Sequence, residues 1–268
     1  MKAVTLLYHD AVKENNFDES GFLDQGANIY KLDVCDMENH FEAIAASKNN
    51  KPSNIYDFLS NKNQIRIPLF LTFDDGGVSS ATYIAKLLEE FGWSGHFFIT
   101  ASYIDTQTFV NSKQIQELKK KGHVVGSHSW SHPDRMSKCS WNELEKEWRK
   151  SIIKLSDIIG EQVSIASVPG GYFSNNVAKA ASACGIRALF TSEPIKEVYY
   201  VDKCLVLGRY TLLRGMSPSV SGALASEDIS FHQVKQYLLW NTKKVAKSIA
   251  GNHYLAIRKR ILRRREDA

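Results

Sequence analysis

The sequence contains no long apolar run and few cysteines. No stretch of the 268 residues approaches the 18 apolar residues that a transmembrane helix needs, and the apolar run at the N-terminus is too short for a signal peptide. No internal repeat is evident. The cysteines include no Cys-x-x-Cys pair, which argues against a zinc knuckle and a disulfide framework; they are Cys35, Cys139, Cys184 and Cys204. We therefore expect a cytoplasmic protein with free thiols.

The chain has enough apolar material for one sizeable core. Its 268 residues are 43% hydrophobic, and barrels of alternating strands and helices reach this length as one domain. The net charge of +5 comes from the C-terminus, where residues 240–268 hold nine Lys and Arg against two acidic residues. We expect a main domain over residues 1–239 and a basic helix or tail over residues 240–268.

Two adjacent carboxylates follow a short apolar segment. Residues 67–73 have the composition of a buried strand, which Gly76 and Gly77 then end. Because side chains alternate across a strand, Asp74 and Asp75 should point in different directions unless the backbone turns there. The two acids are therefore expected to have different roles. An isolated Asp-Asp pair is more often a turn or a helix cap.

Two histidines four residues apart follow a second apolar segment. Residues 122–127 favour a buried strand, and Pro133 keeps the preceding residue out of helical geometry, so His128 and His132 should lie at a strand end and in its loop. A lone histidine is usually structural. One carboxylate with two neutral imidazoles, however, is a plausible ligand set for a catalytic zinc ion, and it leaves the other carboxylate available as a general base.

These two segments resemble the motifs of the polysaccharide deacetylases, the carbohydrate esterase family 4. The family carries Thr-Phe-Asp-Asp-Gly, found here at residues 72–76, and His-Ser/Thr-x-x-His-Pro, found here at residues 128–133. The resemblance implies that Asp74 is the catalytic base and that Asp75, His128 and His132 hold a divalent metal, most often zinc. It also implies hydrolysis of an acyl group, usually acetate, from the nitrogen of an amino sugar.

The sequence departs from the family pattern after these motifs. The family's third motif supplies an arginine that braces the base, but Ser167 and Val168 stand where it is expected. The turn that follows is kept, and the resemblance implies that the backbone amide of Tyr172 contacts the oxyanion. The histidine that serves the family as general acid has no clear counterpart.

Three residues could fill these gaps. His9 ends an apolar run at the N-terminus, so a first barrel strand would deliver it to the same rim as the acidic pair. Arg209 cannot donate a proton at neutral pH, but it could neutralise an oxyanion or bind a substrate phosphate. His232 is better explained as a surface helix residue.

The remaining pattern alternates strands with helices. Residues 95–100, 165–168, 188–191 and 205–207 favour strands, whereas residues 79–91, 141–159 and 175–184 favour helices. This order predicts an α/β fold, a distorted (β/α) barrel of about seven parallel strands with surrounding helices. Residues 11–66 are a possible insertion or lid, and residues 215–230 resemble a linker or loop.

The basic C-terminus has two equally weighted interpretations. Residues 254–265 place six cations among four aliphatic side chains, a pattern typical of segments that lie on an anionic membrane. A solvated helix or positive tail explains it equally well. Nucleic acid is an unlikely partner because aromatic residues are sparse there and no recognition motif accompanies the charge.

We therefore expect a metal-dependent carbohydrate N-deacetylase. A cytoplasmic location, peripheral at the inner membrane face, would direct it to nucleotide-linked or lipid-linked amino sugars used in surface polysaccharide biosynthesis. One alternative is hydrolysis of another small amide on the same barrel. The other is a catalytically degenerate protein that binds a glycan.

Overall fold

A nine-stranded sheet forms the centre of the described part of the chain. The computed structural model describes residues 1–47, 51–60 and 66–250, with side chains described up to residue 242. In spatial order the strands are β11 (Tyr210–Thr211), β1 (Val4–Tyr8), β4 (Leu69–Phe73), β5 (His96–Ile99), β6 (Val124–Ser127), β7 (Ile165–Ser167), β8 (Ala188–Phe190), β10 (Cys204–Leu207) and β9 (Tyr199–Val201). All neighbours are parallel except β9 and β10.

One short segment joins the two ends of this strand order. β10 pairs with β8, and β11 pairs with β1, yet only Gly208 and Arg209 separate β10 from β11 along the chain. Residues 204–211 therefore bring the two ends of the sheet together. β10 and β11 count as one strand position, because they are successive parts of the same segment. Counted this way, the sheet has seven parallel strand positions, as the sequence predicts.

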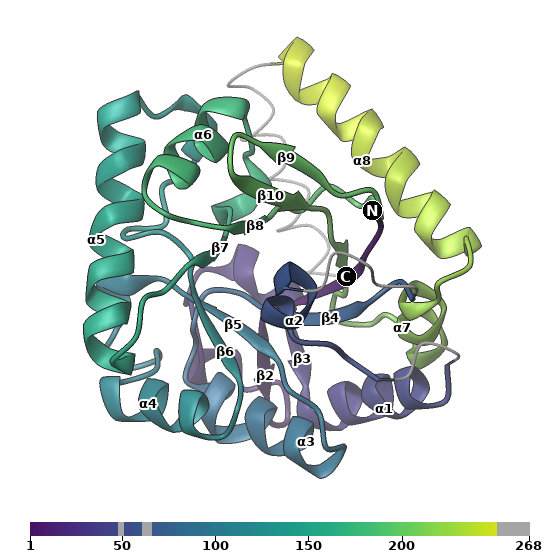
Figure 1. The fold of residues 1–268 in the computed structure, drawn as a ribbon. Coiled ribbons are helices and arrows are strands. Elements are labelled where there is room, and N and C mark those ends of the chain that lie inside the picture. Colours follow the sequence, from purple (N-terminus) through teal and green to yellow (C-terminus); the bar gives the residue numbers. More distant parts are fainter. Residues whose placement is uncertain (48–50, 61–65, 251–268) are drawn as a thin grey trace.

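The helices lie around the strands (Figure 1). They are α1 (Val34–Ala45), α3 (Ala85–Glu90), α4 (Ser112–Lys120), α5 (Trp141–Ile159), α6 (Asn175–Ala183), α7 (Pro218–Ala225) and α8 (Phe231–Ala250), and a π-helical turn over Ser80–Ile84 leads into α3. The predicted capping box of α5 is present, since Ser140 accepts from the Glu143 amide and the Glu143 side chain accepts from the Ser140 amide. None of the described helices is both long and apolar enough to cross a membrane.

Strand alternation divides the apolar side chains into two cores. In β4, Leu69 and Leu71 pack in the larger core, between the strands and the outer helices, whereas Phe70 belongs to the core inside the barrel. The short helix α2 (Ile55–Ser60) contributes Ile55 and Phe58 to that inner core. Because α2 packs on residues near the amino ends of the strands, it covers one end of the barrel, and the carboxyl ends lie at the other.

The segment between β1 and β4 has structure of its own. β2 (Asp10–Val12) and β3 (Lys31–Asp33) form a small parallel sheet, with 3₁₀ turns over Phe17–Glu19 and Gln25–Tyr30 between them. The predicted insertion over residues 11–66 thus contains β3, α1, α2 and most of β2. This segment reaches the carboxyl ends of the barrel strands, as described below.

One expectation for the C-terminal region is wrong. Residues 215–230 are not only a loop, because Pro218 starts α7, which packs on α1. The boundary expected between residues 239 and 240 falls within α8. Residues 254–265, where the sequence suggests a membrane-binding segment, lie outside the described residues.

Candidate active site

The predicted site residues follow three parallel strands. His9 comes directly after β1, Asp74 and Asp75 after β4, and His128 after β6. The carboxyl ends of parallel barrel strands share one rim, where the connecting loops build the active sites of such barrels. The structure therefore brings together residues that are more than a hundred positions apart in the sequence.

The backbone turns at Asp75. Its φ is 74°, in the left-handed region, and Gly76 follows at φ 83°. Asp74 continues the inward direction of Phe70 and Thr72, while the turn redirects Asp75 toward the histidines. His132 also has a positive φ, of 55°. Non-glycine residues in this conformation cost free energy, and such strain concentrates at functional sites.

Asp75, His128 and His132 fit one metal ion. One ligand atom from each lies within 4.8 Å of the other two. The Asp75 Oδ1 is 3.3 Å from His128 Nε2 and 3.6 Å from His132 Nε2. Ligand atoms about 2.1 Å from a tetrahedral ion are separated by about 3.4 Å, so these spacings suit a single zinc-sized ion.

The protonation of these residues favours ligation. Burial alone would raise the pKa of Asp75, but its hydrogen bond with His128 and the nearby histidine charges hold the pKa well below the usual range. Burial lowers the pKa of His132, although Asp75 opposes this. A carboxylate and a neutral imidazole are the forms that bind a metal.

Hydrogen bonds orient the two histidines. The Nδ1 of His128 is 2.5 Å from Ser167 Oγ, and this contact turns the other ring nitrogen, Nε2, toward Asp75. The loop before His132 is held by Glu147 of α5, whose carboxylate accepts from the Trp130 amide at 3.0 Å and from the Ser131 amide at 2.8 Å. Partners of this kind fix the ring orientation of metal-binding histidines.

Asp74 forms a buried ion pair with Arg209. The guanidinium donates two bonds, at 2.7 Å to Oδ1 and 2.8 Å to Oδ2, and Ser167 Oγ donates a third to Oδ1 at 3.0 Å. The Asp74 side chain is 3% exposed and that of Arg209 is 0% exposed. Burial alone would raise the pKa of Asp74, but Arg209 and His128 hold it below its usual value. Asp74 is thus an oriented carboxylate.

The position of Arg209 follows from strand alternation. Leu205 and Leu207 of β10 belong to the inner core, so Arg209, two residues further on, also points into the barrel. Its Nε also donates to the Thr191 carbonyl oxygen, and its Nη1 to Thr72 Oγ1. Because its donors are used inside the protein and its surface is covered, the structure assigns Arg209 the brace of Asp74 and not the substrate contact expected from the sequence.

His9 stands beside the acidic pair, because Tyr8 of β1 pairs with Phe73 of β4. Its charge, when present, lowers the pKa of Asp74 and of Asp75. Its ring lies 4.5 Å from that of Tyr30, and its buried Nδ1 has no hydrogen-bond partner among the described residues. Buried polar atoms in proteins are normally paired, so this ring is available for a proton transfer or a ligand.

The turn after β7 carries Tyr172. Pro169–Gly171 forms a 3₁₀ turn, and the Tyr172 amide donates to the Pro169 carbonyl oxygen at 3.3 Å. This bond is long for an N–H···O interaction. The amide expected to contact an oxyanion is therefore only weakly engaged within the turn.

The β2–β3 segment supplies aromatic rings to the site. Phe22 lies 4.9 Å from the ring of His132, and Tyr30 packs on His9. Lys31 holds this segment by donating 2.6 Å bonds to the carbonyl oxygens of Phe17 and Phe22. The predicted insertion therefore borders the metal-binding residues.

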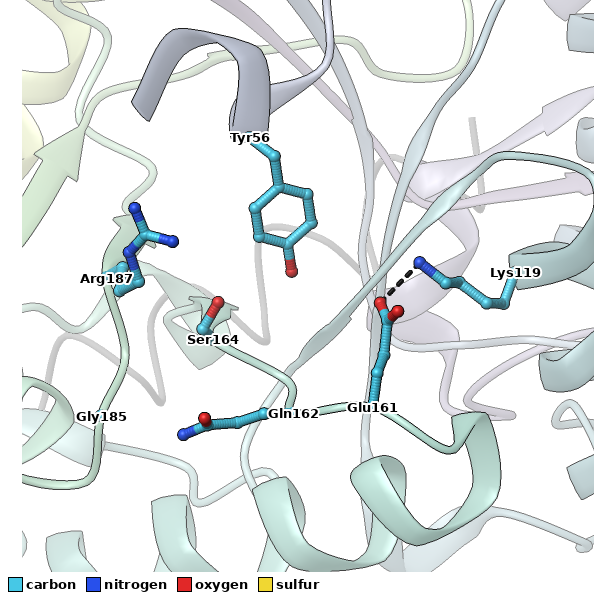
Figure 2. Close-up of a pocket in the computed structure, with 7 residues that line it drawn as sticks. All are labelled: Tyr56, Lys119, Glu161, Gln162, Ser164, Gly185 and Arg187. Atoms are coloured by element: carbon cyan, nitrogen blue, oxygen red, sulfur yellow. Dashed lines mark ion pairs between the residues drawn. The ribbon is translucent and has the colours of Figure 1, made fainter. Parts of the chain in front are cut away.

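A separate hollow lies at the other end of the barrel (Figure 2). Its lining includes Tyr56 of α2, Ser164 just before β7 and Arg187 just before β8. Lys119 and Glu161 form an ion pair on its wall, with Nζ 2.5 Å from Oε1. These residues are at the amino ends of the strands, away from the carboxylates and histidines described above.

Sequence reasoning missed Ser167 and Glu147 as partners of the site. Ser167 stands where the arginine brace is expected, and its Oγ lies between His128 Nδ1 and Asp74 Oδ1. The empty brace position was itself a signal that Asp74 needs another partner. No local pattern identifies Glu147, because its contacts depend on how α5 packs.

Comparisons with known proteins relate this chain to polysaccharide deacetylases. The family model for polysaccharide deacetylase matches residues 61–189. An uncharacterised 30.6 kDa protein of Geobacillus stearothermophilus is 29% identical over 156 residues, 58% of this chain and 57% of that protein. The peptidoglycan-N-acetylmuramic acid deacetylase PdaA of Bacillus subtilis is 27% identical over 156 residues, again 58% of this chain and 57% of that protein.

A solved structure extends the likeness in fold. The Streptococcus pyogenes deacetylase PplD matches with a TM-score of 0.67 at 19% identity, over 81% of this chain and 95% of that chain. The sequence matches, by contrast, span less than two thirds of the length of the two curated relatives. Both His9 and Arg209 lie outside the residues matched by the family model.

Proposed function

Because this chain belongs to the polysaccharide deacetylase family, we propose that it is a metal-dependent hydrolase that removes an N-acyl group, usually acetyl, from an amino sugar. The observation that carries the proposal is the juxtaposition of two sets of residues. Asp75, His128 and His132 form a ligand set, and Asp74, braced by Arg209, lies beside it with Oδ2 3.8 Å from His128 Nε2. The intact base and ligands argue against a degenerate glycan-binding protein.

The two carboxylates then have separate roles. A divalent ion held by Asp75, His128 and His132, most often zinc in such a donor set, would supply Lewis acidity toward the amide carbonyl. Asp74 accepts the proton that a water molecule loses as it attacks the carbonyl carbon. Arg209 keeps Asp74 ionised and fixes both of its oxygens. The Tyr172 amide exchanges its long bond to Pro169 for one to the oxyanion.

His9 is our proposal for the general acid. The leaving nitrogen of an amide needs a proton, and His9 has a buried, unpartnered ring nitrogen close to both acids. Imidazole is the side chain best suited to donate a proton near neutral pH. This assignment uses a residue that follows the first barrel strand in place of the histidine that the family pattern leads one to expect.

Replacing His9 with alanine should slow amide hydrolysis by about 10² to 10⁴-fold, the usual contribution of a general acid. Hydrolysis of 4-nitrophenyl acetate should change much less, because its leaving group does not need a proton. Kinetics of both substrates, with metal content measured in parallel, check the role. Equal losses on the two substrates would indicate that His9 shapes the site instead.

Removing Arg209 should destabilise the fold. An Arg209→Met variant leaves a buried carboxylate without its counter-charge, and breaking a buried pair in this way costs about 3–5 kcal/mol of unfolding free energy. Urea denaturation measures it. The Asp74→Asn/Arg209→Met double variant should lose less than the sum of the two single variants, since the pair is coupled. Additive losses would contradict the bracing role.

The proposed substrates are nucleotide-linked or lipid-linked amino sugars used in surface polysaccharide synthesis in the cytoplasm. Acetate release from the metal-loaded protein tests this, with nucleotide-linked, lipid-linked and polymeric N-acetyl sugars compared at equal concentrations. Preference for a polymer would overturn the precursor assignment. Release from another small amide alone would replace the amino sugar as substrate, and no release from any of them would overturn the hydrolase.

A further inference from the structure

In the part of α8 whose side chains the structure describes, glutamines face α7 and β11. Gln233 is 3% exposed, and its side-chain amide donates to the carbonyl oxygens of Leu224 and Ser226 at 3.0 Å each. Gln236 exchanges two hydrogen bonds with the backbone of Thr211 in β11, at 3.0 and 2.8 Å. The inner side of the helix is therefore held by amide hydrogen bonds.

Up to residue 242, the opposite side of α8 carries exposed apolar side chains. Phe231 is 75% exposed, Val234 42% and Leu238 59%. At about 100° per residue these three lie within an arc of about 60°, on the side of the helix opposite Gln236. Together with Tyr237 and Leu239, and with Ile229 just before the helix, they form what we call the α8 apolar face.

This distribution is the reverse of a surface helix that packs on its own protein. Such a helix buries its apolar stripe and exposes its polar side. Contiguous exposed apolar residues on a protein surface mark an interaction site. Figure 1 shows α8 on the outside of the barrel, running on from α7.

The positive charge of the surrounding sequence favours an anionic membrane over a second copy of the chain as the partner. Lys235 lies within the α8 apolar face, and residues 240–268 hold nine Lys and Arg against two acidic residues. A second copy of the chain would bring the same positive charges together. Anionic lipid instead offers an apolar layer beneath a negative surface, which suits apolar side chains bordered by cations. We propose that the α8 apolar face docks this protein on an anionic membrane.

Helix α8 also lies close to the candidate site. The Trp240 ring lies so close to Gly171 that a Cβ built on that glycine would be 3.2 Å from it, and Gly171 precedes Tyr172. The inner side of α8 thus lies beside the rim that carries the site. A site close to the docked helix would suit a substrate anchored in the membrane, and this point rests on the proposed function. The docking itself does not rest on it.

Sedimentation with vesicles tests the docking. The full chain should bind vesicles of phosphatidylcholine with phosphatidylglycerol, and bind phosphatidylcholine alone much less. Phe231→Ser/Leu238→Ser should weaken binding by about tenfold or more, since both side chains leave the apolar layer. The matched control is Trp141→Ser/Ile153→Ser on α5, which removes side chains that are 45% and 54% exposed and should bind as the wild type does.

Several outcomes would overturn the proposal. They are absence of binding by the full chain, equal binding by the α8 variant, and equal loss in the α5 control. Concentration-dependent dimers that the α8 variant abolishes, without vesicle binding, would make a second copy the partner. Unfolding free energies should be alike for all three proteins, which excludes misfolding as the cause.

Further measurements separate the electrostatic part of the binding from the apolar part, and the binding from the enzymatic activity. Higher salt should weaken binding, because screening acts within about 8 Å at physiological ionic strength. Deleting residues 254–268 should lower the salt-dependent part only. Acetate release from a water-soluble substrate should be unchanged in the α8 variant. Vesicle binding without any deacetylation would therefore refute the proposed function and leave the docking intact.

Discussion

An Asp74→Asn variant should lose about 10² to 10⁴-fold of the turnover number while retaining its metal. Asparagine has nearly the same size, so the cavity around Arg209 stays filled, but an amide does not accept the proton that the carboxylate accepts. Asp74 does not belong to the Asp75, His128 and His132 set. Steady-state kinetics with acetate release, and elemental analysis of the same preparation, measure the two effects.

The paired measurement distinguishes the two aspartates. Activity close to that of the wild type would exclude Asp74 as the base. Loss of the metal would instead show that the roles of Asp74 and Asp75 are reversed. Asp74→Asn also removes the partner of a buried guanidinium, so unfolding in urea should be recorded to confirm that the protein is folded under the assay conditions.

Replacing either His128 or His132 with alanine should remove most of the bound divalent ion, and activity with it. The wild type should carry one ion per chain. Loss of one of three protein ligands should lower the affinity by more than the 10- to 100-fold that loss of an outer hydrogen-bond partner costs. Ser167→Ala provides that milder comparison, because Ser167 contacts His128 without belonging to the ligand set.

His232→Ala serves as the control, since this histidine lies on α8 and is outside the ligand set. Its metal content should equal that of the wild type. Undiminished metal in both the His128 and the His132 variants would eliminate the proposed centre. Folding should be confirmed by circular dichroism, because the buried His128 ring also supports the Ser167 hydrogen bond.

Local sequence was sufficient for the elements that carry the site. Short apolar segments predicted β4 and β6, and the Ser140–Glu143 pair marked the start of α5. The same rules failed at residues 215–230, where Ser and Gly suggested a linker. There α7 forms because it buries Leu224 and Ala225 and packs on α1, a contact that local propensity does not report.

The sequence by itself determined the chemistry of the rim: Asp74 and Asp75 follow one strand and His128 follows another, and parallel strands place their carboxyl ends together. Only the tertiary structure decided which residues support that chemistry. Ser167 and Arg209 reach Asp74 because residues 204–211 close the strand order, so that inward side chains of distant strands meet within the barrel. Likewise, the outward apolar face of α8 follows only from the contacts of Gln233 with α7 and of Gln236 with β11. Packing, and not composition, decides which side of a helix faces the rest of the protein.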